Sequence, residues 1–168
     1  KYSNFELLLM IDDNFKKKYC EINTYFENFK NLNIQIFYSG ENLGNYTNYN
    51  TLINYTDAEF IFITEPNTIW NKNLITECVK IFNFKSNIDV IQYKYNRYNC
   101  DNGNNLDYYN NIFNTNVGWA WGDAMLAFRK TVFQEIGYFD NARFDSDSEY
   151  FYRIKKYFTV LNLDENLY

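Results

Sequence analysis

The sequence predicts an α/β fold in which a mostly parallel, twisted sheet is flanked by helices. Two short apolar runs, Phe5–Ile11 (with Glu6 as its one polar residue) and Phe60–Ile63, have the length and composition of strands buried on both faces. Stretches with apolar residues at helical spacing separate these runs from further strand-like segments. Strands that alternate with helices in this way imply a parallel sheet with helices on both faces.

The N-terminal third is expected to form two strands and two helices. Phe5–Ile11 is the first strand, and helical spacing of apolar residues predicts a helix over Cys20–Phe29. Alternation predicts a strand over Asn33–Tyr38. The loop Ser39–Gly44 contains two glycines, and a second helix is expected over Asn45–Tyr55.

Acidic residues follow the first predicted strand. Asp12 and Asp13 come directly after its last apolar residue, so a buried strand would deliver carboxylates at its carboxyl end. Ligands of open α/β sheets bind at that end. The alternative is that Asp13 or Asn14 only caps the next helix.

The strand Phe60–Ile63 ends abruptly before Pro66, which is the only proline. Proline has no N–H for a sheet and pushes Glu65 out of the helical region. Glu65 and Asn67 then present oxygen atoms at a strand end, which suit a hard divalent cation that carries phosphates. The alternative is a polar turn, with a helix capped by Thr68 or Asn71.

The C-terminal half continues the alternation of strands and helices. We expect a helix over Lys72–Phe82, a strand over Ile88–Tyr93, a strand over Ala124–Arg129, a short helix over Thr131–Ile136 and a last strand over Val160–Leu163. Between the second and third of these elements, residues 100–116 have little apolar periodicity and are expected to form a long loop, which is often a lid or binding loop.

Two further segments carry candidate site residues. Trp119 and Trp121 lie between Gly118 and Gly122, and flat aromatic faces of this kind can stack on a sugar ring or belong to the core. Residues 140–150 concentrate acids. Ser146 or Asp147 could cap a helix that runs to Tyr157, with Glu149 in its first turn.

Composition narrows the classes of function. The 168 residues suit one domain, and 46% hydrophobic residues argue against disorder. A net charge of −5 disfavours nucleic-acid binding, and no histidine is present for a Ser–His triad or an imidazole metal site. No apolar run is long enough to span a membrane. Three widely spaced cysteines predict free thiols in a reducing compartment, so we expect a cytoplasmic protein.

Four segments, in order, resemble motifs of the family 2 glycosyltransferases, which have the GT-A nucleotide-diphospho-sugar transferase fold. They are FELLLMIDDN, GENLGNYTNYNTLI, DAEFIFITEPNTIW and MLAFRKTVFQEIGYFDNARFDSDSEYFYRI, and the last is the most specific. The resemblance runs from about Phe5 to Tyr168. It therefore implies a single, partial GT-A domain over residues 1–168.

The resemblance also implies an activity and its residues. A hexosyltransferase-like enzyme would move a sugar from a nucleotide-diphosphate donor to a hydroxyl of a glycan, protein or lipid acceptor, with inversion. Asp147 would be the general base. Nucleotide contacts would come from Asp12, Asp13, Asn42, Gly44 and Asn50. Glu65 and Asn67 would hold Mn²⁺ or Mg²⁺, and Trp121, Gly122 and Glu149 would flank the acceptor.

The chain departs from the family pattern in three places. Glu65-Pro66-Asn67 replaces the metal-binding D-x-D, so one ligand is a neutral carbonyl oxygen. Tyr49 replaces an arginine before Asn50. The family's first strand and helix have no counterpart before Phe5, although that strand normally lies between the strands at Phe5–Ile11 and Phe60–Ile63. These departures support an alternative, a catalytically inactive GT-A-like module for binding or assembly.

Overall fold

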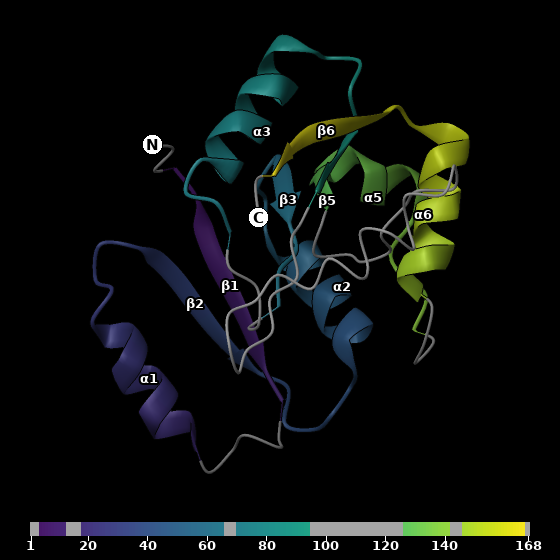
Figure 1. The fold of residues 1–168 in the computed structure, drawn as a ribbon. Coiled ribbons are helices and arrows are strands. Elements are labelled where there is room, and N and C mark those ends of the chain that lie inside the picture. Colours follow the sequence, from purple (N-terminus) through teal and green to yellow (C-terminus); the bar gives the residue numbers. More distant parts are fainter. Residues whose placement is uncertain (1–3, 13–17, 66–69, 95–125, 142–145, 167–168) are drawn as a thin grey trace, which may run out of the picture.

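The computed structural model describes residues 4–12, 18–65, 70–94, 126–141 and 146–166 (Figure 1). It confirms an α/β fold in which helices flank the sheets. The elements are β1 (Glu6–Ile11), α1 (Tyr19–Glu27), β2 (Asn33–Tyr38), α2 (Asn45–Tyr55), β3 (Phe60–Phe62), α3 (Leu74–Phe84), β4 (Val90–Lys94), β5 (Leu126–Arg129), α5 (Lys130–Ile136), α6 (Ser146–Tyr157) and β6 (Val160–Asn166). None of the helices in these ranges is long and apolar enough to cross a membrane.

The expected strands and helices appear with small shifts at their ends. The helix expected over Lys72–Phe82 begins and ends two residues later, at Leu74 and Phe84. Asn71 lies just before it, where its Oδ1 accepts the Asn73 N–H at 2.9 Å. The polar turn of the alternative interpretation is therefore present, whereas the N-cap of α3 itself is Asn73 and no side chain caps it. Glu65 is a separate feature at the end of β3.

The strands form two sheets instead of one. β1 and β2 pair in parallel, with Glu6 opposite Asn33 and Ile11 opposite Tyr38. The second sheet has the order β3-β5-β4-β6, in which β4 and β6 are parallel and β5 runs antiparallel to both of its neighbours. The expectation of one mostly parallel sheet therefore needs two corrections: the described strands form two sheets, and β5 is reversed.

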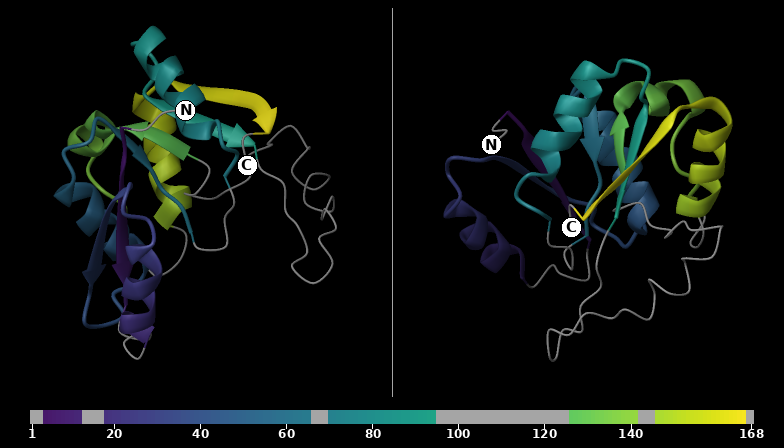
Figure 2. Two further views of the ribbon diagram at one scale, coloured as in Figure 1. Left: turned by 90° about the vertical axis from the view of Figure 1, so that its left-hand side faces the viewer. Right: turned by 45° about the horizontal axis from the view of Figure 1, so that its top comes forward.

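Side chains of the four-stranded sheet alternate between two apolar cores. Val90 of β4 and Phe128 of β5 belong to one core, with residues of α2, α5 and α6. Ile91 and Ala127 point to the other core, which is filled by Leu74, Cys78 and Phe82 of α3. The alternation follows from the strand period of two, and it explains why these strands are continuous apolar runs. Figure 2 shows α3 on the opposite side of this sheet from α6.

Arg129 joins the end of β5 to the end of α3. Its Nε donates to the Ile88 carbonyl at 2.8 Å, and its Nη2 donates to the Phe82 carbonyl. The guanidinium also lies over the Phe60 and Phe82 rings, at 5.4 and 5.0 Å from their centroids. A cation that satisfies carbonyls at a helix C-terminus is stabilising, so Arg129 holds the C-terminal end of α3 against the sheet.

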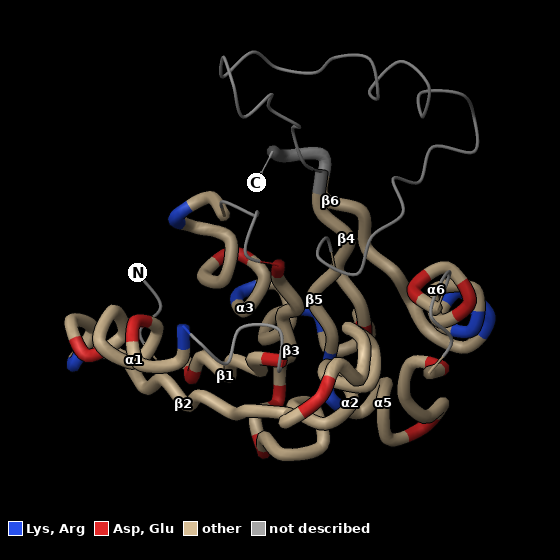
Figure 3. Tube along the Cα trace, turned by 90° about the horizontal axis from the view of Figure 1, so that it is seen from below, with Lys and Arg blue, Asp and Glu red and all other residues tan. Residues whose placement is uncertain are grey.

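The edges of the two sheets lie next to each other. Seen end on, the strands follow the order β2, β1, β3, β5, β4, β6 (Figure 3). In the part of the chain that the structure describes, β1 forms a sheet ladder with β2 alone and β3 with β5 alone. Thr56, which precedes β3, donates a hydrogen bond to the Glu6 carboxylate of β1. We refer to this boundary between β1 and β3 as the seam.

We expect the two described cysteines to differ sharply in reactivity. Cys20 is exposed, whereas Cys78 is buried in the core under α3. Burial, helped by Glu77, raises the pKa of the Cys78 thiol to about 12, and the thiolate is the form that reacts. Iodoacetamide at pH 8 should modify Cys20 and spare Cys78, as measured by peptide mass mapping. Equal rates at both sites would contradict the buried position.

The same thiol should make stability depend on alkaline pH. Its pKa rises from 9.0 to about 12 on folding, so the folded state retains a proton that the unfolded state releases. This contribution is complete below pH 9 and is lost as the pH rises toward 12. A Cys78→Ser variant should weaken that alkaline loss.

Candidate functional site

The candidate site lies where the strands end. β1 and β2 run toward the lower side of Figure 1, and the N-terminal ends of α2 and α6 lie on that same side. Asp12 follows β1 and is half-buried, and its backbone carbonyl accepts the Tyr19 hydroxyl at 3.2 Å. This edge therefore brings together a strand-end acid and two helix N-termini, as the strand order of an open sheet predicts.

Glu65 is the acid that follows β3. The residue is half-buried, and its carboxylate has no hydrogen-bond or ion-pair partner among the described residues. The neighbouring Thr64 hydroxyl donates only to the Glu65 backbone carbonyl. A carboxylate with no partner in the described part of the chain can bind a cation from outside the protein.

The turn before α2 is shaped by Asn42 and Gly44. Asn42 Oδ1 accepts the Gly44 N–H at 3.1 Å, and Gly44 has a φ of 80°, which side-chain-bearing residues rarely adopt. A Cβ on Gly44 would meet no atom within 4 Å, so the backbone angle alone requires glycine. α2 has no side-chain cap hydrogen bond, so no capping side chain among the described residues occupies its first N–H groups.

Asn50 lies on α2 and is fully engaged with another segment. Its Nδ2 donates to the Phe139 carbonyl at 2.8 Å, and its Oδ1 accepts the Phe139 N–H at 3.1 Å. Nδ2 also lies 3.3 Å from Asn141 Oδ1. The resemblance assigns Asn50 to the nucleotide, and the structure shows that its side chain bonds Phe139 and Asn141, in the connection between α5 and α6.

Asp147 lies in the first turn of α6. The residue is half-buried, and Oδ1 accepts the Ser148 N–H at 2.8 Å. Helix α6 begins at Ser146, so Asp147 interacts favourably with the positive end of the helix dipole. Its second carboxylate oxygen has no hydrogen-bond partner among the described residues. Asp147 thus combines a helix-end position with room for one more contact.

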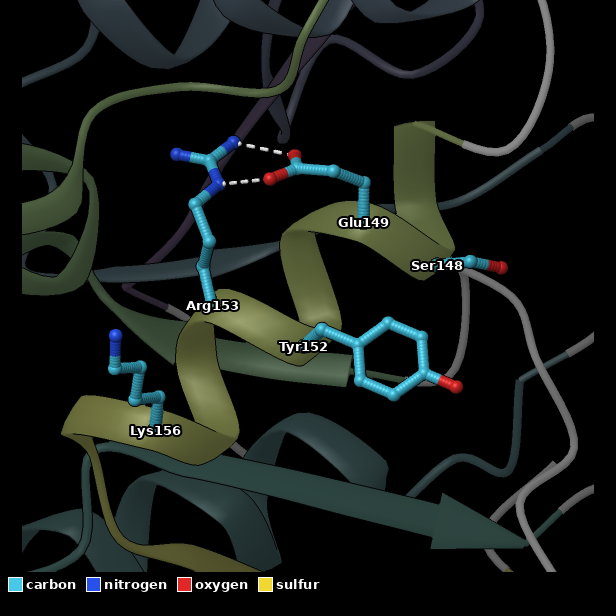
Figure 4. Close-up of a pocket in the computed structure, with 5 residues that line it drawn as sticks. All are labelled: Ser148, Glu149, Tyr152, Arg153 and Lys156. Carbon is cyan, nitrogen blue, oxygen red and sulfur yellow. Dashed lines mark hydrogen bonds and ion pairs between the residues drawn. The ribbon is translucent and has the colours of Figure 1, made fainter.

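Glu149 forms a double ion pair with Arg153 one turn further along α6 (Figure 4). The two N–O distances are 2.6 and 2.8 Å, and the fork geometry is the strong form of this interaction. Arg153 also donates to the carbonyls of Ile136 and Tyr138, at 2.7 and 2.8 Å. A shallow, open hollow on the outer face of α6 is lined by Ser148, Glu149, Tyr152, Arg153 and Lys156.

Four of the predicted site residues cannot be placed. Asp13, Asn67, Trp121 and Gly122 lie outside the described residues. Arg153, in contrast, was not singled out from the sequence, although its spacing of four from Glu149 on a predicted helix was a usable signal. Its bonds to Ile136 and Tyr138 were not predictable, because they join residues of two different elements.

The described residues do not assemble a metal site by themselves. No group of three or more acidic or cysteine side chains in these ranges is placed to hold an ion. Glu65 supplies one carboxylate, and a cation here would need its other ligands from a bound molecule. That donor set fits a metal delivered with a diphosphate, since Mg²⁺ is usually held by one or two carboxylates and phosphate oxygens.

Comparison with solved structures identifies proteins of similar fold, although sequence comparison identifies none. No family model and no curated protein matches the sequence. Among solved structures, S. aureus TarS 1-349 in complex with UDP has a TM-score of 0.73 and 15% identity, over 99% of this chain and 51% of TarS. The mannosyltransferase PcManGT from Pyrobaculum calidifontis, in complex with GDP-Man and Mn²⁺, has a TM-score of 0.65 and 11% identity. This match covers 94% of this chain and 54% of the PcManGT chain.

The fold is that of a glycosyltransferase. The chain spans about half the length of these structures, and at 11–15% identity the likeness concerns the fold. A glycosyltransferase fold agrees with the α/β class predicted from the sequence.

Proposed function

We propose that this chain is the nucleotide-sugar-binding part of a family 2 glycosyltransferase of the GT-A type. It would move a sugar from a nucleotide-diphosphate donor to a hydroxyl of a glycan, protein or lipid acceptor. The main support is that Asp12 and Glu65 follow strands that end at one edge of a glycosyltransferase-like fold, where α6 also begins. The nucleotides in the two solved structures support the donor class.

The donor would be bound by the strand end of β1 and the turn before α2. Asp12 and Asp13 would contact the base or the ribose, whose N–H and hydroxyl groups donate to carboxylates. Asn42 and Gly44 shape the turn that leads to the uncapped α2, whose N–H groups suit an anionic diphosphate. Asn50, which bonds the Phe139 backbone, receives a different role below.

A divalent cation, Mn²⁺ or Mg²⁺, is the proposed cofactor. Glu65 and Asn67 would hold it, with the diphosphate completing its ligands, and it would offset negative charge on the leaving group. Glu65 fits this task because its carboxylate has no partner in the described part of the chain. Asn67 gives only a neutral oxygen, so we expect weaker metal affinity than two carboxylates would give.

Asp147 is the proposed general base. Its carboxylate would accept the proton of the acceptor hydroxyl while that oxygen attacks the anomeric carbon, and the nucleoside diphosphate would leave from the opposite face with inversion. Trp121, Gly122 and Glu149 would flank the acceptor. Glu149 is held by Arg153, so it would offer a fixed hydrogen-bond acceptor instead of a second base.

The family's first strand is proposed to be missing between β1 and β3. The separation of the strands into two sheets supports this view, since that seam is where the family's strand would pair. On this proposal residues 1–168 are part of a single GT-A domain. The free thiols of Cys20 and Cys78 support a reducing compartment such as the cytoplasm.

A thermal-shift panel tests the proposal. UDP-, GDP- and dTDP-sugars are each added with Mn²⁺ or with EDTA, and a ligand of the native state raises Tm by mass action. We expect one nucleotide class to raise Tm more with Mn²⁺ than with EDTA. A Glu65→Gln variant should lose the metal-dependent part of the shift, whereas a Glu135→Gln variant, with an exposed carboxylate on α5, should keep it.

The other outcomes of the panel separate the alternatives. A shift that is equal with Mn²⁺ and EDTA would support nucleotide binding and remove the metal role of Glu65 and Asn67. A flat panel on a cooperatively folding sample would contradict nucleotide binding by this chain. It would favour the inactive binding or assembly module instead.

A further inference from the structure

The connection between α5 and α6 is held from two sides. We call residues Ile136–Asn141 the strap, since they link the end of α5 to the segment that leads into α6. Gly137 in the strap has a φ of 81°, a left-handed angle that ends α5. The strap lacks strand and helix bonds of its own, so its shape depends on side chains from elsewhere.

On the α2 side, the strap is bound by Asn50. Its carboxamide presents one donor and one acceptor to the Phe139 backbone, as an adjacent strand would. Rings of Tyr46 and Tyr49 lie 5.6 and 6.3 Å from the Phe139 ring and extend this contact. Asn141 Oδ1 lies 3.4 Å from the Thr47 hydroxyl, so the contacts between the strap and α2 cover a little more than one helical turn.

On the α6 side, the strap is bound by Arg153 and Tyr150. Arg153 donates to the carbonyls of Ile136 and Tyr138, at 2.7 and 2.8 Å, and the Tyr150 hydroxyl donates to the Gly137 carbonyl at 2.9 Å. The Tyr150 ring is buried and lies 4.4 Å from the Phe139 ring. Successive carbonyls of the strap are therefore fixed to α6 itself, the helix that carries Asp147.

We propose that Asn50 is a positioning residue that couples α2 to α6 through the strap. This inference rests on the proposed function, in which the start of α2 serves the donor and the first turn of α6 carries the base. Both polar atoms of the Asn50 side chain already bond the strap, and on this proposal the nucleotide is bound by other residues. Asn50 would fix the position of α6 relative to α2.

The rate of sugar transfer should depend on the position of α6 relative to α2. A base must lie within hydrogen-bond reach of the acceptor hydroxyl while that oxygen faces the anomeric carbon of the donor. A misplacement of about 1 Å by a change far from the reaction can lower the rate about 100-fold. Loosening the strap would move α6 relative to the donor without removing any group that binds the nucleotide.

Two variants of Asn50 test the proposal, with Thr51→Ala as the control. Asn50→Ala removes both bonds to Phe139, whereas Asn50→Asp keeps an acceptor for the Phe139 N–H and loses the donor. Thr51 is an exposed neighbour whose hydroxyl donates only to the Thr47 carbonyl of the same helix. Measurements are Kd for UDP, GDP or dTDP, kcat and KM with the matching sugar donor, and amide hydrogen exchange of Phe139.

For both Asn50 variants we expect Kd and donor KM within about twofold of the unchanged chain, and kcat lower by about tenfold to 100-fold. Exchange at the Phe139 amide should be faster in Asn50→Ala and less affected in Asn50→Asp. Thr51→Ala should have the same Kd, KM, kcat and Phe139 exchange rate as the wild-type chain. Hydrogen exchange does not depend on activity, so it tests the bonds between Asn50 and the strap separately.

Two results would overturn the positioning role. An increase in nucleotide Kd in step with the fall in kcat, with unchanged exchange at Phe139, would make Asn50 a nucleotide contact. Unchanged kcat in both variants would show that the strap does not set the position of the base. If the unchanged chain bound no nucleotide, the proposed function would fail first, and the positioning role would fail with it.

Discussion

Replacing Phe128 with alanine should lower the free energy of unfolding by about 3–5 kcal/mol. Phe128 lies on β5, inside the four-stranded sheet, and its side chain is 0% exposed. Its ring centroid is 5.0 Å from that of Phe133 of α5 and 6.5 Å from that of Tyr150 of α6. The substitution removes an aromatic ring that two helices share, and rigid neighbours cannot close the cavity.

The matched control is Phe84→Ala. Phe84 ends α3 and is 88% exposed, so its removal should change stability by less than about 0.5 kcal/mol. Urea unfolding followed by circular dichroism measures both variants. Similar losses for Phe84 and Phe128 would show that the core does not lie between the sheet and α5, α6.

Replacing Asp147 with asparagine should reduce sugar transfer by about 100-fold to 10⁴-fold, the contribution typical of a positioned general base. Asparagine keeps the shape of the side chain and its bond to the Ser148 N–H, and it cannot accept the acceptor proton. Turnover is measured as nucleoside diphosphate release in the presence of an acceptor. The Kd of the nucleotide should stay within about twofold, since the donor is bound at other residues.

Glu135→Gln on the exposed side of α5 serves as the control for removal of one negative charge. It should retain full turnover. If Asp147→Asn also retained full turnover in a sample that binds the nucleotide, Asp147 would not be the base. A combined loss of turnover and of nucleotide binding would point to a role in donor binding.

Strands and helices of this chain were predictable because local pattern determines them. Strand β3 is an unbroken apolar run that stops before Pro66, and α3 shows apolar residues at helical spacing. The direction of β5 was not predictable in this way. The run Leu126–Arg129 has the same apolar composition in either direction, and its antiparallel pairing depends on contacts with β3 and β4.

The site was predictable in part. Acids that follow buried strands, such as Asp12 and Glu65, could be placed at one edge because sheet topology brings strand ends together. The partner of Asn50 could not, because Phe139 lies far along the sequence and no spacing rule connects them. Arg153 shows both cases, since its pair with Glu149 follows helix geometry and its bonds to the strap follow tertiary packing.

The seam has a consequence for handling the protein in solution. Residues 7–11 of β1 include no charged residue and no proline, and natural proteins use such residues to protect exposed sheet edges. An edge of this kind is a template for strands of other molecules. Self-association of this chain should therefore increase with concentration, and a lysine at an outward position of β1 would reduce it.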